Sequence, residues 1–139
     1  MTTQALFDLA NKHHHMLLEP PADGKIDSVS IRLPSGICAV FVGKTENKKE
    51  YREKLGHEMG HCEKNAFYTK LSAPTTREKC EESANRWQYE NMVPEDELNA
   101  AFRAGIRTPW ELSDLFDLPE SVVVAAHNYY THIKHALTR

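Results

Sequence analysis

The spacing of hydrophobic and polar positions divides the chain into a mixed first third and a helical remainder. Residues 2–13 carry apolar side chains three and four apart, which predicts an opening helix, and the turn sequence at 20–24 ends this element. Residues 28–33 alternate between polar and apolar, which predicts a strand with a buried apolar face and a wet polar face. A Pro-Ser-Gly turn at 34–36 then leads into the more buried strand 37–42.

In the remainder of the chain, apolar residues recur at the spacing of α-helices. A capping box from Thr75 to Glu78 opens one of them, Pro94 ends it, and Thr108 begins a second box further on. The expected helices span residues 50–66, 75–93, 95–104, 109–116 and 119–136. The pattern predicts an α+β fold in which a small antiparallel sheet packs with about six helices. We expect one compact unit, with a core over 1–93 and a helical, helix-turn-helix-like subdomain over 94–139.

Charge and length exclude several classes of function. A net charge of −3 over 139 residues provides no basic face, so we expect no nucleic-acid partner. No apolar run approaches the roughly 20 residues of a membrane span, so we expect no membrane partner. The first residues, MTTQALFDLANK, do not have the pattern of a signal peptide. These features indicate a cytoplasmic protein.

Three cysteines and a run of three histidines are further candidates for metal or redox chemistry. Cys38, Cys62 and Cys80 are widely spaced and form no C-x-x-C pair, so we expect reduced, partly buried thiols. Cys62 and Cys80 lie close to the residues discussed next, and the alternative is an adventitious ligand or an oxidation-sensitive thiol. Contiguous residues on a helix point in different directions, so the run 13–15 is not expected to share a metal.

The segment 53-EKLGHEMGHCEK-64 contains the pattern H-E-x-x-H on a predicted helix. Residues four apart project from one helical face, so His57 and His61 can both present a ring nitrogen to one Zn²⁺. Glu58 is one residue further on, and its carboxylate would lie beside the ion rather than on it. There it could accept a proton from a water molecule whose pKa zinc lowers to about 7.

A catalytic zinc needs a third protein ligand and an open fourth position. The next predicted helix carries 81-EESANRW-87, and either Glu81 or Glu82 could complete the set. We favour Glu81, because Asn85 lies one turn later on the same face and could orient the Glu81 carboxylate or a histidine.

A helix rich in His and Glu could also be only a polar surface. Gly56 and Gly60 count against that reading, because each costs about 1 kcal/mol in a helix interior relative to alanine. Glycines beside a His-Glu pair are useful where a strand, a substrate or a neighbouring backbone must approach the metal face.

With these motifs the chain resembles the ImmA/IrrE family of HExxH metallopeptidases, particularly the short members encoded by phages and mobile elements. The likeness covers most of the chain, and H-E-x-x-H followed by E-x-x-A-N-x-W carries it. The resemblance implies a zincin-like core with Zn²⁺ bound by His57, His61 and Glu81, and with Glu58 as general base. Met59 stands where the family usually has Leu, a volume-conserving exchange.

The resemblance also implies a biological role. The short members are typically site-specific endopeptidases that cut, or help to inactivate, a helix-turn-helix repressor encoded beside them, and an activating protein partner is often suspected. We therefore expect a protein substrate of this kind.

Two other functions remain open at the level of sequence. A DNA-binding regulator would use the helix-turn-helix rhythm of 109–130, but its second helix carries no Arg or Lys before Lys134. A non-catalytic zinc protein would bind a repressor or toxin partner without cutting it.

In the enzyme, an additional donor would stabilise the developing oxyanion. The candidates are Tyr68, His127, Tyr129 and His132.

Overall fold

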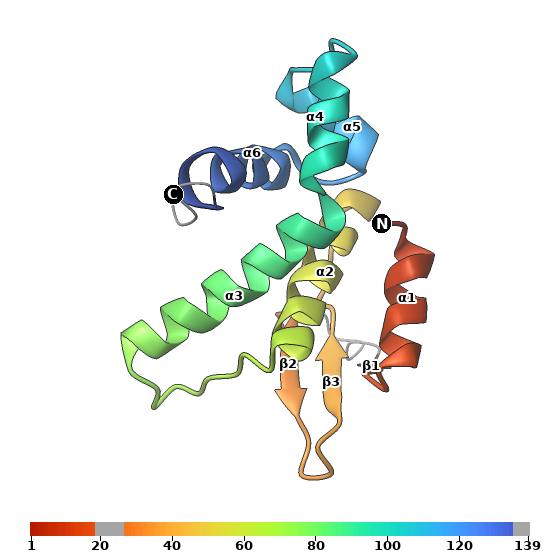
Figure 1. The fold of residues 1–139 in the computed structure, drawn as a ribbon. Helices are drawn as coiled ribbons and strands as arrows, with labels where there is room; N and C mark the ends of the chain where they lie inside the picture. Colours follow the sequence, from red (N-terminus) through yellow and green to blue (C-terminus); the bar gives the residue numbers. More distant parts are fainter. Residues whose placement is uncertain (19–26, 135–139) are drawn as a thin grey trace.

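The structure is a computed structural model, and it describes residues 1–18 and 27–134 (Figure 1). The turn expected at 20–24 and the last residues of the expected helix 119–136 lie outside this part of the chain. The elements are α1 (Thr3–Lys12), β1 (Met16–Leu18), β2 (Val29–Arg32), β3 (Cys38–Phe41), α2 (Lys48–Lys64), α3 (Pro74–Met92), α4 (Glu95–Arg103), α5 (Pro109–Phe116), α6 (Glu120–Asn128) and a π-helical segment, η1 (Tyr129–Lys134). The predicted α+β class is confirmed.

The sheet has three strands in the order β1-β3-β2. β2 and β3 form the predicted antiparallel hairpin, in which Ile31 pairs with Ala39. β1 was not predicted, and it pairs with β3 in parallel, Leu17 opposite Val40. The sheet is therefore mixed rather than purely antiparallel. A strand of three residues is too short to show an alternation of polar and apolar side chains, so β1 is recognised only by its pairing with β3.

The faces of β2 are the reverse of the expected ones. Val29 and Ile31 are 37% and 41% exposed, whereas Ser30 between them is half-buried. Alternation identified the strand correctly but not the face that the fold covers. Ser30 makes a side-chain hydrogen bond with Glu58 of α2, so the polar face of β2 covers a polar site.

Helix α2 lies between the sheet and α3 (Figure 1). Asn47 caps its first turn by accepting a hydrogen bond from the Glu50 amide, and Asn65 ends it in the left-handed conformation, with φ of 50°. α3 begins at Pro74 without a side-chain cap, so the capping box predicted from Thr75 to Glu78 does not form. Thr108 does cap α5, because its hydroxyl accepts from the Glu111 amide, and the same hydroxyl also donates to Glu111 Oε1 at 2.6 Å.

The crossing of α2 and α3 depends on a glycine. A Cβ built at Gly60 would lie 2.6 Å from the carbonyl oxygen of Ala84 and 3.1 Å from its Cα. These are backbone atoms of α3, so only a residue without a side chain permits this distance. The expectation that a neighbouring backbone approaches the motif helix is confirmed at Gly60.

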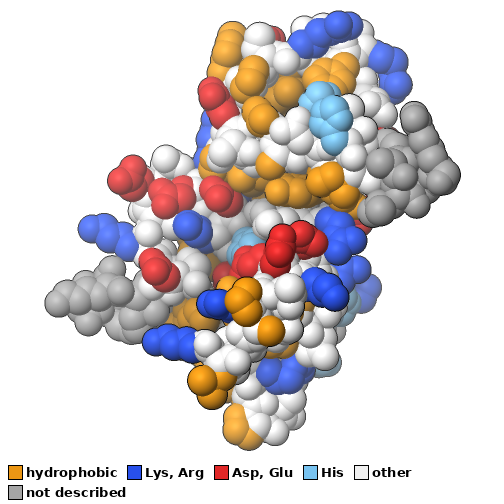
Figure 2. Space-filling view, turned by 90° about the vertical axis from the view of Figure 1, so that its left-hand side faces the viewer, with side chains coloured by type: hydrophobic (Ala, Val, Ile, Leu, Met, Phe, Trp, Pro, Cys, Tyr) orange, Lys and Arg blue, Asp and Glu red, His pale blue; other side chains and the backbone are white. Residues whose placement is uncertain are grey.

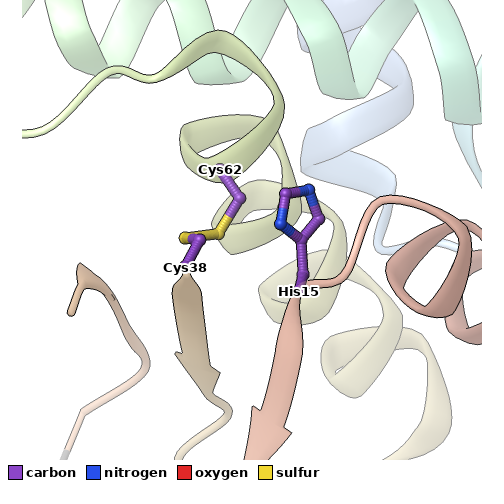
Figure 3. A group of neighbouring side chains, drawn as sticks. All are labelled: His15, Cys38 and Cys62. Carbon is purple, nitrogen blue, oxygen red and sulfur yellow. A yellow bond between two sulfur atoms is a disulfide. The ribbon is translucent and has the colours of Figure 1, made fainter. Parts of the chain in front are cut away.

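A disulfide between Cys38 and Cys62 connects β3 to α2, with the two Cα atoms 5.8 Å apart (Figure 3). The expectation of reduced thiols is therefore wrong for this pair, and Cys80 is the free cysteine. The spacing of 24 residues gave no sign of the bond. It results from the packing of the inner face of β3 directly against α2.

The buried side chains form one apolar cluster that extends from Leu6 to Tyr130 and includes residues of α4, α5 and α6. The expected division between residues 1–93 and 94–139 stays a prediction. None of the described helices is long and apolar enough to cross a lipid bilayer.

A buried arginine on α2 connects this helix to the ends of two other elements. The Arg52 guanidinium, only 4% exposed, donates to the carbonyl oxygens of Met1 at 2.5 Å and Asp117 at 2.8 Å. It also reaches the Thr3 hydroxyl at 3.2 Å and the Phe116 carbonyl at 3.3 Å. These bonds hold the start of α1 and the end of α5 against the motif helix.

We expect Arg52→Leu to lower the free energy of unfolding by about 2–3 kcal/mol, because several carbonyl groups lose their donor. Urea unfolding with the disulfide intact measures this difference. Arg103→Leu, on the exposed side of α4, is the matched control and should change stability by no more than about 0.5 kcal/mol. Equal effects of the two substitutions would contradict the role assigned to Arg52.

Candidate metal centre

His57 and His61 project from α2 one helical turn apart and meet at one point. Their Nε2 atoms are 3.2 Å apart, and the two rings stand nearly perpendicular, at 84°. The His61 side chain is 6% exposed and that of His57 is 24% exposed. The pair therefore lies at the bottom of a site that opens to solvent on the His57 side.

The tautomer of His61 follows from its second nitrogen. Nδ1 lies 2.6 Å from the carbonyl oxygen of Ala66, just beyond the end of α2. A carbonyl can only accept, so Nδ1 must carry the proton. In the neutral ring Nε2 then presents a lone pair toward His57, which is the form that binds a metal ion.

Glu81 approaches the two histidines from α3. Its Oε2 lies 2.8 Å from His57 Nε2, and its Oε1 lies 3.3 Å from His61 Nε2. One donor atom from each of the three residues lies within 4.8 Å of the others. Glu82 is exposed and belongs to no such group within residues 1–18 and 27–134. Two imidazoles and one carboxylate match the donor set of a catalytic zinc, so these residues fit Zn²⁺.

We expect Glu81→Gln to weaken Zn²⁺ binding by at least about 100-fold, whereas Glu82→Gln should leave the affinity unchanged. Competition titration against a chromophoric chelator, with the Cys38–Cys62 disulfide intact, measures both values. If Glu82→Gln releases the metal and Glu81→Gln retains it, the ligand on α3 is the neighbouring residue.

The hydrogen bond that orients Glu81 comes from Tyr68. The Tyr68 hydroxyl donates to Glu81 Oε1 at 2.6 Å, which raises the pKa of Tyr68 to about 12. Burial alone would raise the pKa of Glu81, but this bond and the two imidazoles outweigh it, and the pKa is lowered. Asn85 lines the same cleft, but among the described residues it donates no hydrogen bond to Glu81, His57 or His61. The expected role of Asn85 stays a prediction.

Glu58 lies beside the three residues rather than among them. Its side chain belongs to the buried part of α2, with 7% of the residue exposed. Burial raises the pKa of the Glu58 carboxyl, and the neighbouring His57 together with the hydrogen bond from Ser30 offsets only part of the rise. Glu58 is thus a carboxylate of increased basicity next to the donor set. Ser30 was assigned to a wet face from sequence, and its role depends on the reversed faces of β2.

The site opens into a cleft of about 690 Å³. Its walls come from four elements and from residues 66–68: β2 with the residues just before it, α2, α3, and α6. The contribution of α6 consists of Ser121, Val122 and Ala125. In Figure 2, a histidine side chain is visible below the surrounding surface and is bordered by acidic side chains. The second helix of the helix-turn-helix-like segment is therefore one wall of the cleft.

Of the four candidates for the oxyanion donor, Tyr68 lines this cleft and the other three do not. The Tyr129 hydroxyl donates to Glu90 at 2.8 Å and the His127 ring packs on Phe102. His132 is exposed on η1. Tyr68 is therefore the one of the four candidates that the fold brings to the donor set.

Comparison with known protein families agrees with this geometry. The family model described as the IrrE N-terminal-like domain, a peptidase family, matches residues 10–127. No curated protein and no solved structure matched the chain. The match covers the sheet, the motif helix, α3 and the helices that follow, and it confirms the resemblance to the ImmA/IrrE family. The chain belongs to the IrrE N-terminal-like domain family of peptidases.

Proposed function

We propose that the protein is a zinc-dependent, site-specific endopeptidase that cleaves a helix-turn-helix repressor of a phage or mobile element. The observation that carries this proposal is the convergence of His57, His61 and Glu81 at the bottom of an open cleft, with Glu58 beside them. A purely structural metal site is closed by protein ligands, whereas this one faces a cleft that can admit a peptide.

The roles of the side chains follow from their positions. When bound, zinc would polarise the scissile carbonyl and acidify a water molecule. Glu58 takes a proton from that water at its carboxylate and returns it to the nitrogen of the leaving amine. Tyr68 lines the cleft and donates its one hydroxyl proton to Glu81, which holds that carboxylate in place. If the hydroxyl turned from Glu81 toward the substrate, the same proton would stabilise negative charge that develops on the carbonyl oxygen.

β2 provides a place for an extended substrate. It is an edge strand, because β3 is its partner on one side and no described strand lies on the other. Residues 27–30 line the cleft, so a peptide that pairs with this edge would pass the metal ligands. Backbone pairing of this kind binds any extended sequence, so the specificity has to come from another wall.

That wall is α6, which supports a protein rather than DNA as the partner. α6 contains no Lys or Arg, and Ser121, Val122 and Ala125 face the cleft. In Figure 2, acidic side chains lie in the middle of the face shown, next to the buried histidine, and such a border disfavours a phosphate backbone. Contacts of a folded repressor with this wall would contribute binding energy that short peptides cannot supply.

We expect cleavage of one specific partner and poor activity on casein or short synthetic peptides. The test incubates wild type and Glu58→Gln with the repressor encoded by the adjacent gene. A discrete fragment should appear with wild type only, and a chelator should abolish it. Efficient, indiscriminate digestion of casein would contradict the specificity.

If the repressor stays intact even with cell extract as a source of an activating partner, the second candidate function is favoured. The protein would then bind the repressor or a toxin as a non-catalytic zinc protein. Co-purification of the uncut partner with wild type and Glu58→Gln alike would identify that case.

A further inference from the structure

A second group of potential ligands lies outside the cleft, where α2 packs against β3. His15 precedes β1, Cys38 begins β3, and Cys62 belongs to α2 (Figure 3). One donor atom from each of the three lies within 4.8 Å of the others. Cys38 and Cys62 are 2% and 4% exposed, and the His15 side chain is 10% exposed. A buried group of two cysteines and one histidine lies outside the cleft already described.

We propose that His15, Cys38 and Cys62 form a second metal site, which binds a thiophilic divalent cation such as Zn²⁺ when the Cys38–Cys62 disulfide is reduced. Two cysteines and a histidine form a known three-residue zinc ligand set, in which a water molecule takes the fourth position. The disulfide and the metal complex use the same sulfur atoms and exclude each other.

The surroundings of His15 favour a metal ligand. Figure 3 shows its Nδ1 on the side of the sulfur pair. The other nitrogen, Nε2, is buried and has no hydrogen-bond partner among the described residues, although Glu63 Oε2 lies 3.8 Å away. A cation on Nδ1 would fix the proton on Nε2, and a small shift would allow Nε2 to donate to Glu63. Metal-bound histidines usually donate to a carboxylate in this way.

The charges also balance. Two thiolates carry −2 and the cation +2, so with a neutral imidazole the site has a net charge of zero. Burying a neutral complex avoids the penalty that two unpaired thiolates would have in this apolar part of the core. Cys38 and Cys62 both belong to the buried apolar cluster. The same burial lowers the pKa of His15, which favours the neutral ring that a ligand requires.

The exchange between the two states is a two-electron reaction. On oxidation, the two thiolates form the S–S bond and release the cation, and the two electrons reduce a low-molecular-weight disulfide to two thiolates, which take up two protons from the solvent. On reduction, a dithiol or a phosphine cleaves the S–S bond, and the cation binds as the thiols lose their protons. Compartments that keep thiols reduced would favour the metal-bound state.

A competing set shares one of these ligands. His13, His15 and Glu63 also place one donor atom each within 4.8 Å of the others, and His13 Nδ1 lies 2.7 Å from Glu63 Oε1. This convergence arises because α1 ends at Lys12 and His14 turns the chain with a φ of 60°. A cation held there would have no sulfur ligand, so spectroscopy separates the two sets.

The test uses Co²⁺ as the probe, because thiolate ligation to cobalt gives a charge-transfer absorption in the near ultraviolet. Metal-free wild type is titrated with Co²⁺ after phosphine reduction and, separately, with the disulfide intact. We expect about two ions per chain and a sulfur-to-cobalt band in the reduced protein, against about one ion and no band in the oxidised protein. This comparison needs no substitution, so it does not depend on the folding of a variant.

Variants then identify the ligands. Cys38→Ser and Cys62→Ser should abolish the band, and His15→Ala should weaken the second ion at least about tenfold. Cys80→Ser and His14→Ala are the matched controls and should keep the band. His57→Ala should also keep it, because His57 belongs to the other site.

Three results would overturn the proposal. They are a reduced wild type that binds a second ion without the sulfur band, a reduced wild type that binds no second ion, and loss of the band in His57→Ala. The first would place the ion with His13 and Glu63, and the last would make Cys62 a ligand of the His57 site.

Discussion

Glu58→Gln should bind Zn²⁺ as tightly as wild type and lower the rate of repressor cleavage by roughly 100- to 10,000-fold. The amide has the size of the carboxyl group but cannot accept a proton from the attacking water. The proposed ligand atoms belong to His57, His61 and Glu81, so the metal should be retained. Replacing a buried carboxylate whose pKa burial raises should not destabilise the fold.

Three measurements on the same variant check this expectation: cleavage rate, zinc affinity and thermal midpoint. Glu78→Gln, an exposed position on α3, is the control for changing one carboxylate to an amide. Loss of zinc together with activity would mean that Glu58 is a ligand. Normal cleavage by Glu58→Gln would assign the base to another group.

Gly60→Ala should lower both the stability of the fold and its affinity for zinc. The added Cβ would lie 2.6 Å from the Ala84 carbonyl oxygen. Because this oxygen belongs to the backbone of α3, it cannot rotate away as the end of a side chain can. We expect a loss of about 2–3 kcal/mol from overpacking, although alanine is favoured in a helix by about 1 kcal/mol. Glu81 lies one turn before Ala84 on α3, so moving the helices apart moves this ligand away from the histidines.

Gly56→Ala is the matched variant, one turn earlier on α2. Its added Cβ would meet the sulfur of Met92, at the end of a flexible side chain that can change rotamer. We expect a smaller loss of stability and unchanged zinc affinity. Differential scanning calorimetry with and without zinc compares the two. A Gly60→Ala protein with the stability and zinc affinity of wild type would contradict the close helix contact.

The parts of the fold that sequence predicted are those that local periodicity determines. The hairpin of β2 and β3, the motif helix and the Thr108 cap depend on residues only a few positions apart. β1 and the Cys38–Cys62 bond depend on contacts across 20 or more residues, which no local pattern records. The reversed faces of β2 have the same origin, because only the position of α2 decides which side is covered.

The sequence also predicted part of the site, namely the residues whose relative position a helix fixes. The i, i+4 spacing alone places His57 and His61 together, since a helix fixes their relative position. Glu81 is next to them as expected, and Tyr68, which no pattern in the sequence placed there, donates a hydrogen bond to it. Tyr68 lies in the irregular segment between α2 and α3, where the conformation of the chain, and thus the direction of a side chain, has no repeat to predict it.

The double connection between His61 and Ala66 gives the two histidines different dynamic roles. The His61 ring donates to the Ala66 carbonyl, and the Ala66 amide donates back to the His61 carbonyl at 2.9 Å, so the His61 ring loses its rotational entropy when the protein folds. His57 is more exposed, and its ring interacts with Glu81 and His61, which belong to the site itself. We therefore expect rotation of His57 to set the rate at which metal enters and leaves, while His61 stays in place throughout.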